Sequence, residues 1–326
     1  MRVLVIAWES LAPQRLGCYG NESAQTSAFD QLAACGMLFS SAFALRPCPT
    51  PQNLVRDRYE ISLITGSPAP STTSARDRLQ AAGVPVRVFE DTLLQAWQRA
   101  NQESQSDREL LLIAAPSPGT TAAAIHEADD DLDEFLADYL PTAQADDLLI
   151  ITASAGEVTA PHPAYGPNNF WPIHESVHVP LLILVGTGDT ATSSCRRSEL
   201  VQLPDVAATA CAWFDVSTAG FKGIPLLTRT HSRPECARES LFYGHDQTGW
   251  GLRTTRHSCL LAPTNAESGV FTSDRECRLF VKPDDPFDVF NIGLESPDLL
   301  RELSEQLREQ ISAKRFLGEI KDQTLR

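Results

Sequence analysis

The chain has 326 residues, of which 42% are hydrophobic, enough for one large packed domain or for one large and one small domain. Its 42 acidic and 27 basic residues give a net charge of −15, which argues against nucleic acid and anionic membranes as partners. We expect no signal peptide and no membrane insertion, and eight cysteines without a Cys-x-x-Cys pair predict reduced thiols in a cytoplasmic protein.

Strand and helix signals alternate through the first two thirds of the chain, which indicates a mainly parallel sheet with helices on both faces. Apolar runs predict strands at residues 3–7, 61–65, 84–89, 110–115, 148–152 and 179–185. Helices are predicted at 26–36, 74–82, 122–140 and 205–214. The acidic residues 129–131 are interpreted as a solvated helix face rather than a metal cluster.

The pattern changes after about residue 240 to short strands, which predicts a small antiparallel sheet. These strands are expected at 240–243, 251–254, 258–261 and 278–281. An amphipathic helix follows at 299–311, with its apolar residues on one face. We therefore divide the chain into an α/β core domain, 1–235, and a C-terminal subdomain, 236–326.

Six motifs occur in the order found in one known family. They lie at 3–20 (ending in Leu-Gly-Cys-Tyr-Gly), 26–39, 146–152, 175–183, 203–209, and 250–254 with 278–291. Together they resemble the sulfatases of the alkaline-phosphatase-like superfamily over nearly the whole chain. The resemblance implies the sulfatase α/β fold, a formylglycine nucleophile made from the cysteine of a Cys-x-Pro-x-Arg motif, and a divalent cation, usually calcium, held by carboxylates.

The metal positions of the family align with residues poorly suited to a cation. Glu9 and Ser10 stand where the family has aspartates, and Ser154 and Ala155 replace an aspartate-histidine pair. Glu9 keeps a carboxylate, which we interpret as part of an ion pair or a solvated strand end in preference to a metal ligand. A single acid is too little for calcium or magnesium, so we predict that this metal site is empty and expect no cofactor.

Cys48 stands at the nucleophile position, but the arginine of the conversion motif is missing. A thiol of lowered pKa could still attack, whereas a buried thiol would be inert. His162 aligns with a family histidine, and Asn169 and His174 lie near the position of a substrate-binding lysine. His162, His174 and His178 could instead bind a transition metal, although Val179-Pro180 argues against a helical histidine pair.

The resemblance leaves three functions to weigh. The first is a catalytically inactive sulfatase-like protein that binds a protein partner or an anionic small molecule. The second is an active sulfuric or phosphoric ester hydrolase with rearranged ligands drawn from Glu9, Cys48 and the three histidines. The third is an interaction protein whose former cleft is filled. We favour the first, because losing interdependent catalytic groups lowers a rate by many orders of magnitude.

Overall fold

The computed structural model describes residues 1–47, 74–104, 106–158, 171–186, 194–221, 223–229, 238–245, 248–262 and 277–324, with side chains of the last helix as far as residue 313. Three predicted site residues, Cys48, His162 and Asn169, fall outside these ranges, as does the predicted strand at 61–65. The predicted domain boundary at 235/236 also lies outside them, so the division stays a prediction. No helix in the described ranges is long and apolar enough to cross a membrane.

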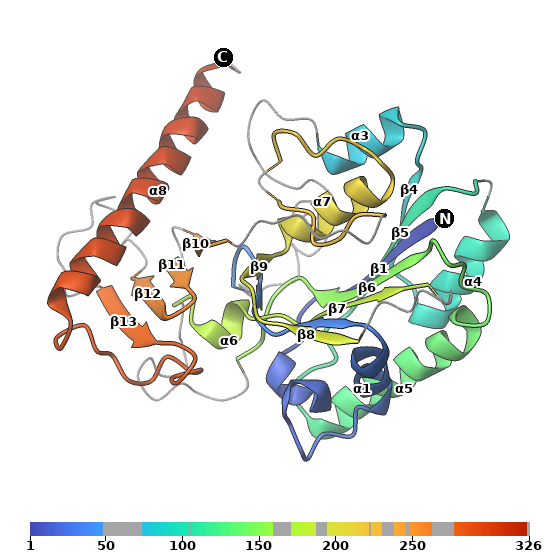
Figure 1. Ribbon diagram of the computed structural model, residues 1–326, viewed down its shortest axis with the longest axis horizontal. Helices are drawn as coiled ribbons and strands as arrows, with labels where there is room; N and C mark the ends of the chain where they lie inside the picture. The colour runs from blue at the N-terminus through green and yellow to red at the C-terminus, as the bar shows by residue number, and fades with distance from the viewer. Residues whose placement is uncertain are drawn as a thin grey trace.

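A seven-stranded sheet forms the centre of the protein (Figure 1). Only β7 runs against its neighbours, which confirms the expected mainly parallel sheet. The strands are, in spatial order, β4 (Val86–Phe89), β5 (Glu109–Ala115), β1 (Arg2–Trp8), β6 (Leu148–Ala153), β7 (Leu181–Val185), β2 (Met37–Phe39) and β8 (Cys195–Arg197).

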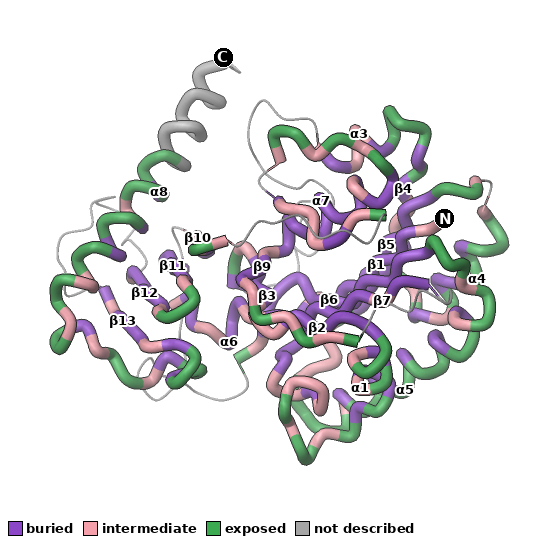
Figure 2. The backbone as a smooth tube through the Cα atoms, viewed as in Figure 1, coloured by how far each residue is buried: buried purple, intermediate pink, exposed green. Residues whose placement is uncertain are grey.

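Helices cover both faces of the sheet, which explains why its central strands are apolar on both sides (Figures 1 and 2). Contacts between helices separate two layers, α1 with α4 and α5 on one face and α3 with α7 on the other. The helices are α1 (Ser27–Cys35), α3 (Ala75–Ala81), α4 (Leu93–Glu103), α5 (Ala122–Tyr139) and α7 (Pro204–Trp213). Helix α4 was not predicted from the sequence.

The first acid of the predicted solvated helix face is buried instead. Asp129 accepts hydrogen bonds at 3.1 Å from the backbone N–H groups of Ala28 and Phe29, the first turn of α1. A carboxylate at this place satisfies two N–H donors at the start of the helix, where the N-cap Thr26 makes no side-chain hydrogen bond. Asp130 and Asp131 remain exposed, so the prediction holds for them and is wrong for Asp129.

The C-terminal part is a four-stranded antiparallel sheet covered by the last helix, as the sequence predicted (Figure 1). Helix α8 (Pro297–Thr324) packs on it through Leu303, Leu307 and Ile311. The strands are β10 (Ser240–His245), β11 (Gly249–Thr254), β12 (His257–Leu261) and β13 (Cys277–Val281).

A further apolar cluster lies on the C-terminal sheet. It brings Phe43 and the short helix α6 (His174–Val177) against Tyr243 and Phe280 of the C-terminal sheet. Phe43 and Tyr243 stack with ring centroids 6.3 Å apart. The remaining small elements are η1 (Pro13–Arg15), η2 (Gly17–Tyr19), β3 (Ala42–Phe43) and β9 (Val201–Gln202), of which β3 and β9 pair as parallel strands.

Candidate functional site

The carboxyl ends of β1, β5 and β6 meet at one edge of the main sheet, where α/β proteins commonly bind ligands. Trp8 is in register with Ala115 of β5 and Ala153 of β6. The backbone continues this alignment beyond the strands, since Glu9 N donates to Ala115 O and Ser154 N to Trp8 O, both at 2.8 Å. The structure therefore brings Glu9, Ser10 and Ser154 to the same edge, as the sequence motifs indicated.

Hydroxyl groups, not carboxylates, occupy most of this edge. The buried Ser10 donates a hydrogen bond from Oγ to Ser117 Oγ at 2.9 Å, and Gly119 N donates to the same Ser117 oxygen at 3.2 Å. Ser154 is also buried, and its Oγ has no hydrogen-bond partner among the described residues. Sequence reasoning missed Ser117, although its position two residues after the end of strand β5 is a signal that could have found it.

Helix α6 closes against the end of β6 through the backbone. Gly156 N donates to Ser176 O at 3.2 Å, and Leu11 N donates to Ala155 O at 3.2 Å. A Cβ at Gly156 would lie 2.1 Å from Glu175 O, so only glycine allows this close approach. The turn that follows β6 thus places α6 beside the hydroxyl-lined edge.

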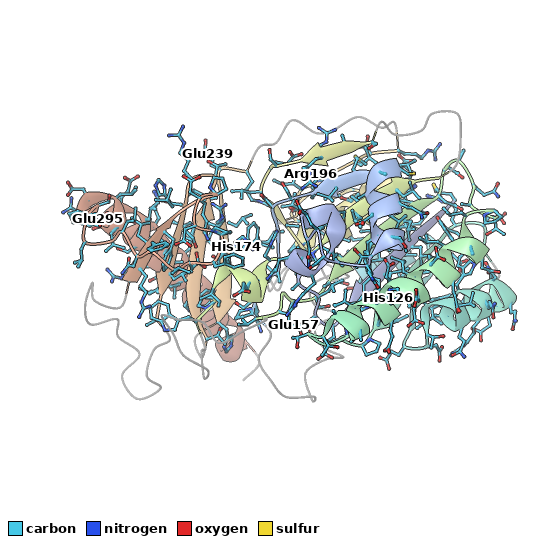
Figure 3. All side chains as sticks on the ribbon, turned by 90° about the horizontal axis from the view of Figure 1, so that it is seen from below. His126, Glu157, His174, Arg196, Glu239 and Glu295 are labelled. Atoms are coloured by element: carbon cyan, nitrogen blue, oxygen red, sulfur yellow. The ribbon has the colours of Figure 1, made fainter. Side chains whose placement is uncertain are left out.

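Charged side chains gather next to that turn. Gln14 of η1 donates from Nε2 to Glu175 Oε1 at 3.3 Å. Burial raises the pKa of Glu157, and the nearby charge of Arg15 partly opposes this. Glu157 Oε2 and Arg15 Nε are both buried without a hydrogen-bond partner in the part of the chain that the structure describes. Figure 3 places Glu157 and His174 between the C-terminal sheet and helix α5, which carries His126.

The donor set does not fit a hard divalent cation. Calcium takes about six to eight oxygen ligands, mostly carboxylates and carbonyls. Within the described ranges, no group of three or more His, Cys, Asp or Glu side chains is arranged to hold a metal ion. Of the three predicted metal positions, Glu9 alone carries an acid, while Ser10 already binds Ser117.

His174 begins α6 and His178 follows its last residue in an extended conformation, with the two ring centroids 4.5 Å apart. The sequence argument against a helical pair agrees with this backbone, since the helix ends at Val177 and His178 forms an antiparallel β-bridge with Phe43. His178 uses the N–H at Nε2 to bind Ser40 O at 3.0 Å, and both rings pack on Phe43.

Both histidines are held neutral. Burial lowers the pKa of His174 well below its usual value, and the neighbouring His178, Lys282 and Arg253 act in the same direction. Burial also lowers the pKa of His178, to about 4, despite the bond to Ser40. His174 is further fixed through its backbone N–H, which donates to Asp288 Oδ2 at 2.6 Å. The backbone of His174 therefore ties α6 to the loop after β13, and neither ring offers a positive charge to an anionic substrate at neutral pH.

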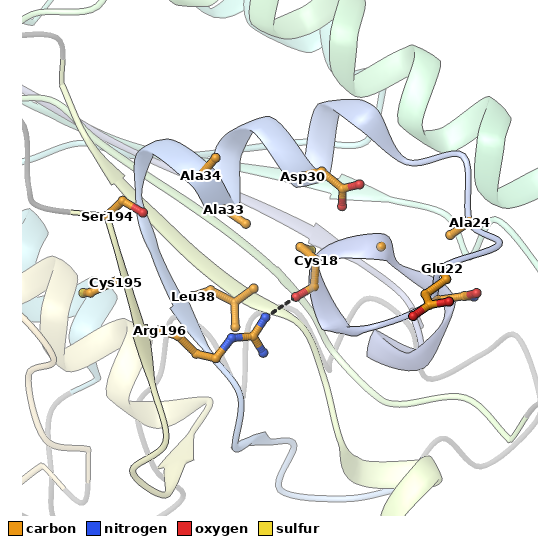
Figure 4. Close-up of a pocket in the computed structure, with 12 residues that line it drawn as sticks. Cys18, Glu22, Ala24, Asp30, Ala33, Ala34, Leu38, Ser194, Cys195 and Arg196 are labelled. Carbon is orange, nitrogen blue, oxygen red and sulfur yellow. Dashed lines mark hydrogen bonds between the residues drawn. The ribbon is translucent and has the colours of Figure 1, made fainter.

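A separate cavity of about 520 Å³ lies at the edge of the sheet between η2, α1 and β8 (Figure 4). Arg196 crosses it and donates to Cys18 O at 2.5 Å. Burial, with the nearby charge of Asp30, raises the pKa of the Cys18 thiol to about 12. This thiol is protonated at neutral pH and cannot act as a nucleophile.

No family model and no curated protein matches the chain by sequence. Solved structures match almost its full length. A putative sulfatase from Bacteroides thetaiotaomicron is 12% identical with a TM-score of 0.71, covering 96% of this chain and 92% of that one. A 2-O GAG sulfatase is 13% identical with a TM-score of 0.72 and the same coverage. The phosphonate monoester hydrolase of Agrobacterium radiobacter is 13% identical with a TM-score of 0.66, covering 95% of each chain. The chain thus has the fold of sulfatases and phosphonate monoester hydrolases, as the motifs predicted.

Proposed function

We propose that this chain is a sulfatase-fold protein that does not hydrolyse sulfate or phosphate esters and instead binds a polar ligand at the carboxyl ends of its central strands. The fold is the starting point, since the chain superimposes on sulfatases over nearly its full length. Fold alone does not define an activity, so the proposal rests on the residues at the site.

The observation that carries the proposal is the pair of serines at the strand ends. Ser10 is hydrogen-bonded to Ser117, and Ser154 is buried, so two neutral oxygens stand where a cation would need charged ligands. Without a cation, the negative charge that develops on a transferring sulfuryl or phosphoryl group has no metal to stabilise it. Losing such a group removes many orders of magnitude in rate.

The binding role is supported by polar atoms that no described side chain satisfies. Ser154 Oγ, Glu157 Oε2 and Arg15 Nε are buried without partners close to the end of β6. Buried polar atoms in native proteins almost always have partners, either in the protein, in water or in a ligand. A small polar ligand, or a polar side chain of a protein partner, would satisfy these groups.

The test combines activity with metal content. We expect the purified protein to hold no stoichiometric calcium, magnesium, manganese or zinc, and to show no turnover of aryl sulfate or aryl phosphate esters when these ions are added. Robust turnover that disappears in Glu9→Ala and Cys48→Ala would establish the rearranged hydrolase instead. Mass measurement of the Cys48 peptide would reveal any aldehyde conversion, which the proposal excludes.

A matched pair of variants tests the reason for the missing metal. The double variant Ser10→Asp with Ser154→Asp supplies two carboxylates beside Glu9, and we expect it to bind calcium in a calorimetric titration. The double variant Ser10→Asn with Ser154→Asn has nearly the same side-chain size without the charge, and should bind none. Calcium binding of equal strength by wild type and the Asp variant would refute the electrostatic argument.

A further inference from the structure

The loop between β13 and α8 exposes large apolar side chains to an unusual degree. Phe287, Phe290 and Leu294 are 44%, 74% and 96% exposed, respectively. Only one other large apolar side chain of the described ranges, Val158, is comparably exposed. Single exposed apolar residues are ordinary on a protein surface, whereas three within eight positions form a candidate interaction site. We call residues 284–296 the apolar loop.

The apolar loop is held by its own hydrogen bonds. Asp285 is buried, and its carboxylate accepts from Val289 N at 3.0 Å and from Phe290 N at 2.8 Å. Asn291 Oδ1 accepts from Leu279 N of β13 and from Gly293 N, both at 3.0 Å. The exposed Phe290 therefore lies on a turn that is fixed by side-chain-to-backbone hydrogen bonds.

A buried ion pair fixes the middle of the loop to the C-terminal sheet. Lys282 Nζ lies 2.7 Å from Asp288 Oδ1, and both side chains are almost completely shielded from solvent. Asp288 has a φ of 57°, a left-handed conformation that costs free energy in a non-glycine residue. These contacts hold Phe287, Phe290 and Leu294 at the surface, whereas a loop without them could turn these side chains inward.

The size of the surface limits what can cover it. The three side chains present roughly 400 Å² of apolar surface, estimated from typical side-chain areas. A stable dimer needs about 800 Å² from each partner. Two copies of this chain, each with a net charge of −15, would also repel one another. The surface fits a short segment of a different protein better than a second copy.

The charges around the loop indicate the nature of that segment. Along the loop and the first turns of α8 the exposed charged residues, which we call the acidic rim, are mostly acids: Asp284, Glu295, Asp298, Glu302, Glu305 and Glu309. Arg301 is the exposed cation of this stretch, and the exposed Arg256 lies near the start of the loop, where its carbonyl accepts from Lys282 N. Arg301 is itself paired with Asp298 at 2.7 Å. Figure 3 places Glu295 at the end of the molecule farthest from His126, well away from the strand-end site. An acidic rim selects a basic partner and speeds its approach.

We propose that the apolar loop is a docking surface for a basic segment of another protein, one that presents apolar side chains to Phe287, Phe290 and Leu294 and lysine or arginine to the acidic rim. The apolar side chains supply the affinity, and the rim supplies the selection by charge. This interaction is independent of the strand-end ligand site, so either proposal can fail without the other.

The experiment uses two labelled synthetic helices as probes, one built from leucine and lysine and one from leucine and glutamate. We expect fluorescence anisotropy to show saturable binding of the leucine-lysine helix by the full chain, weakening as salt is added, and much weaker binding of the leucine-glutamate helix. The double variant Phe290→Ser with Leu294→Ser should bind the basic helix about tenfold more weakly.

Val158→Ser is the matched control, since it removes an exposed apolar side chain outside the loop and should bind the basic helix as wild type does. Thermal unfolding checks that all variants are folded. Equal affinity of wild type and the double variant, or equal affinity for the acidic and basic helices, would overturn the proposal. A dimer seen by sedimentation that dissociates in the double variant would also overturn it, because the surface would then be covered by a second copy.

Discussion

His178 should make the stability of the protein depend on pH in a way that one substitution can isolate. Its ring lies against Phe43 and Tyr19 and binds Ser40 O, and burial lowers its pKa to about 4. In the unfolded chain the pKa of this histidine returns to about 6.5. Between about pH 6.5 and pH 4 the unfolded state therefore binds a proton at His178 and the folded state does not. The contribution of the neutral His178 to the free energy of unfolding is fully present above about pH 6.5 and is lost as the pH falls towards 4. The full difference amounts to about 3 kcal/mol.

The variant His178→Gln tests this value. The glutamine amide nitrogen can take the place of Nε2 and keep the bond to Ser40, but it cannot be protonated. We would measure the free energy of unfolding by urea titration at several pH values between about 7 and 4.5, following circular dichroism. Between these limits the wild type should lose about 2–3 kcal/mol more than His178→Gln.

His126→Gln, at an exposed histidine of α5, controls for the exchange of histidine for glutamine itself. The buried carboxyls of Asp129 and Glu157 are common to all three proteins and cancel in the comparison. His174 lies beside His178, so the measured difference reports the two neighbouring histidines together. Identical pH dependence in wild type and His178→Gln would show that the folded protein accepts a proton at His178, and the reasoning from burial would be wrong.

Three further substitutions test buried contacts, each by denaturant unfolding. Gly156→Ala should cost about 1–3 kcal/mol, because the new Cβ would lie 2.1 Å from a backbone oxygen of α6. Asp205→Asn should cost about 3–5 kcal/mol, since the buried Asp205 binds Arg238 through two bonds at 2.6 and 2.8 Å, while the exposed Asp215→Asn should change stability by less than about 0.5 kcal/mol. Asp129→Ala should cost about 1–2 kcal/mol by leaving two N–H groups of α1 without an acceptor, and the exposed Asp130→Ala should cost much less. Equal losses for Asp205→Asn and Asp215→Asn, or for Asp129→Ala and Asp130→Ala, would contradict the roles assigned to the two buried carboxylates.

The fold was predictable wherever a strand is buried on both faces. The apolar runs of β1, β5 and β6 mark them as central strands, and the structure confirms them. Helix α4 was missed although Leu93, Ala96, Trp97 and Ala100 recur at helical spacing, so the signal was present. Strands β2 and β8 have three residues each, and β7 runs antiparallel to β6; such features depend on pairing between distant segments, which a local pattern does not record.

The positions of the site residues that follow strands could be predicted from the sequence motifs. Glu9, Ser10 and Ser154 follow buried strands, so their meeting at one edge could be inferred from the sequence. The hydrogen bond between Ser10 and Ser117 could not, because it joins segments 107 residues apart. The burial of Asp129 was missed for the same reason, since the groups it binds lie about 100 residues earlier in the chain.

At the strand-end site the backbone frame and the side chains that could do chemistry are set by different residues. Its frame is made by main-chain bonds, from Glu9 to Ala115, from Leu11 to Ala155 and from Ser154 to Trp8, and none of these needs a particular side chain. Several carboxylates crowded at that edge would repel one another unless a cation neutralised them. Serine hydroxyls remove this repulsion and can bind each other, as Ser10 and Ser117 do. The fold can therefore persist without a metal at these positions, which is why its likeness to sulfatases and the chemistry of its site must be judged by different observations.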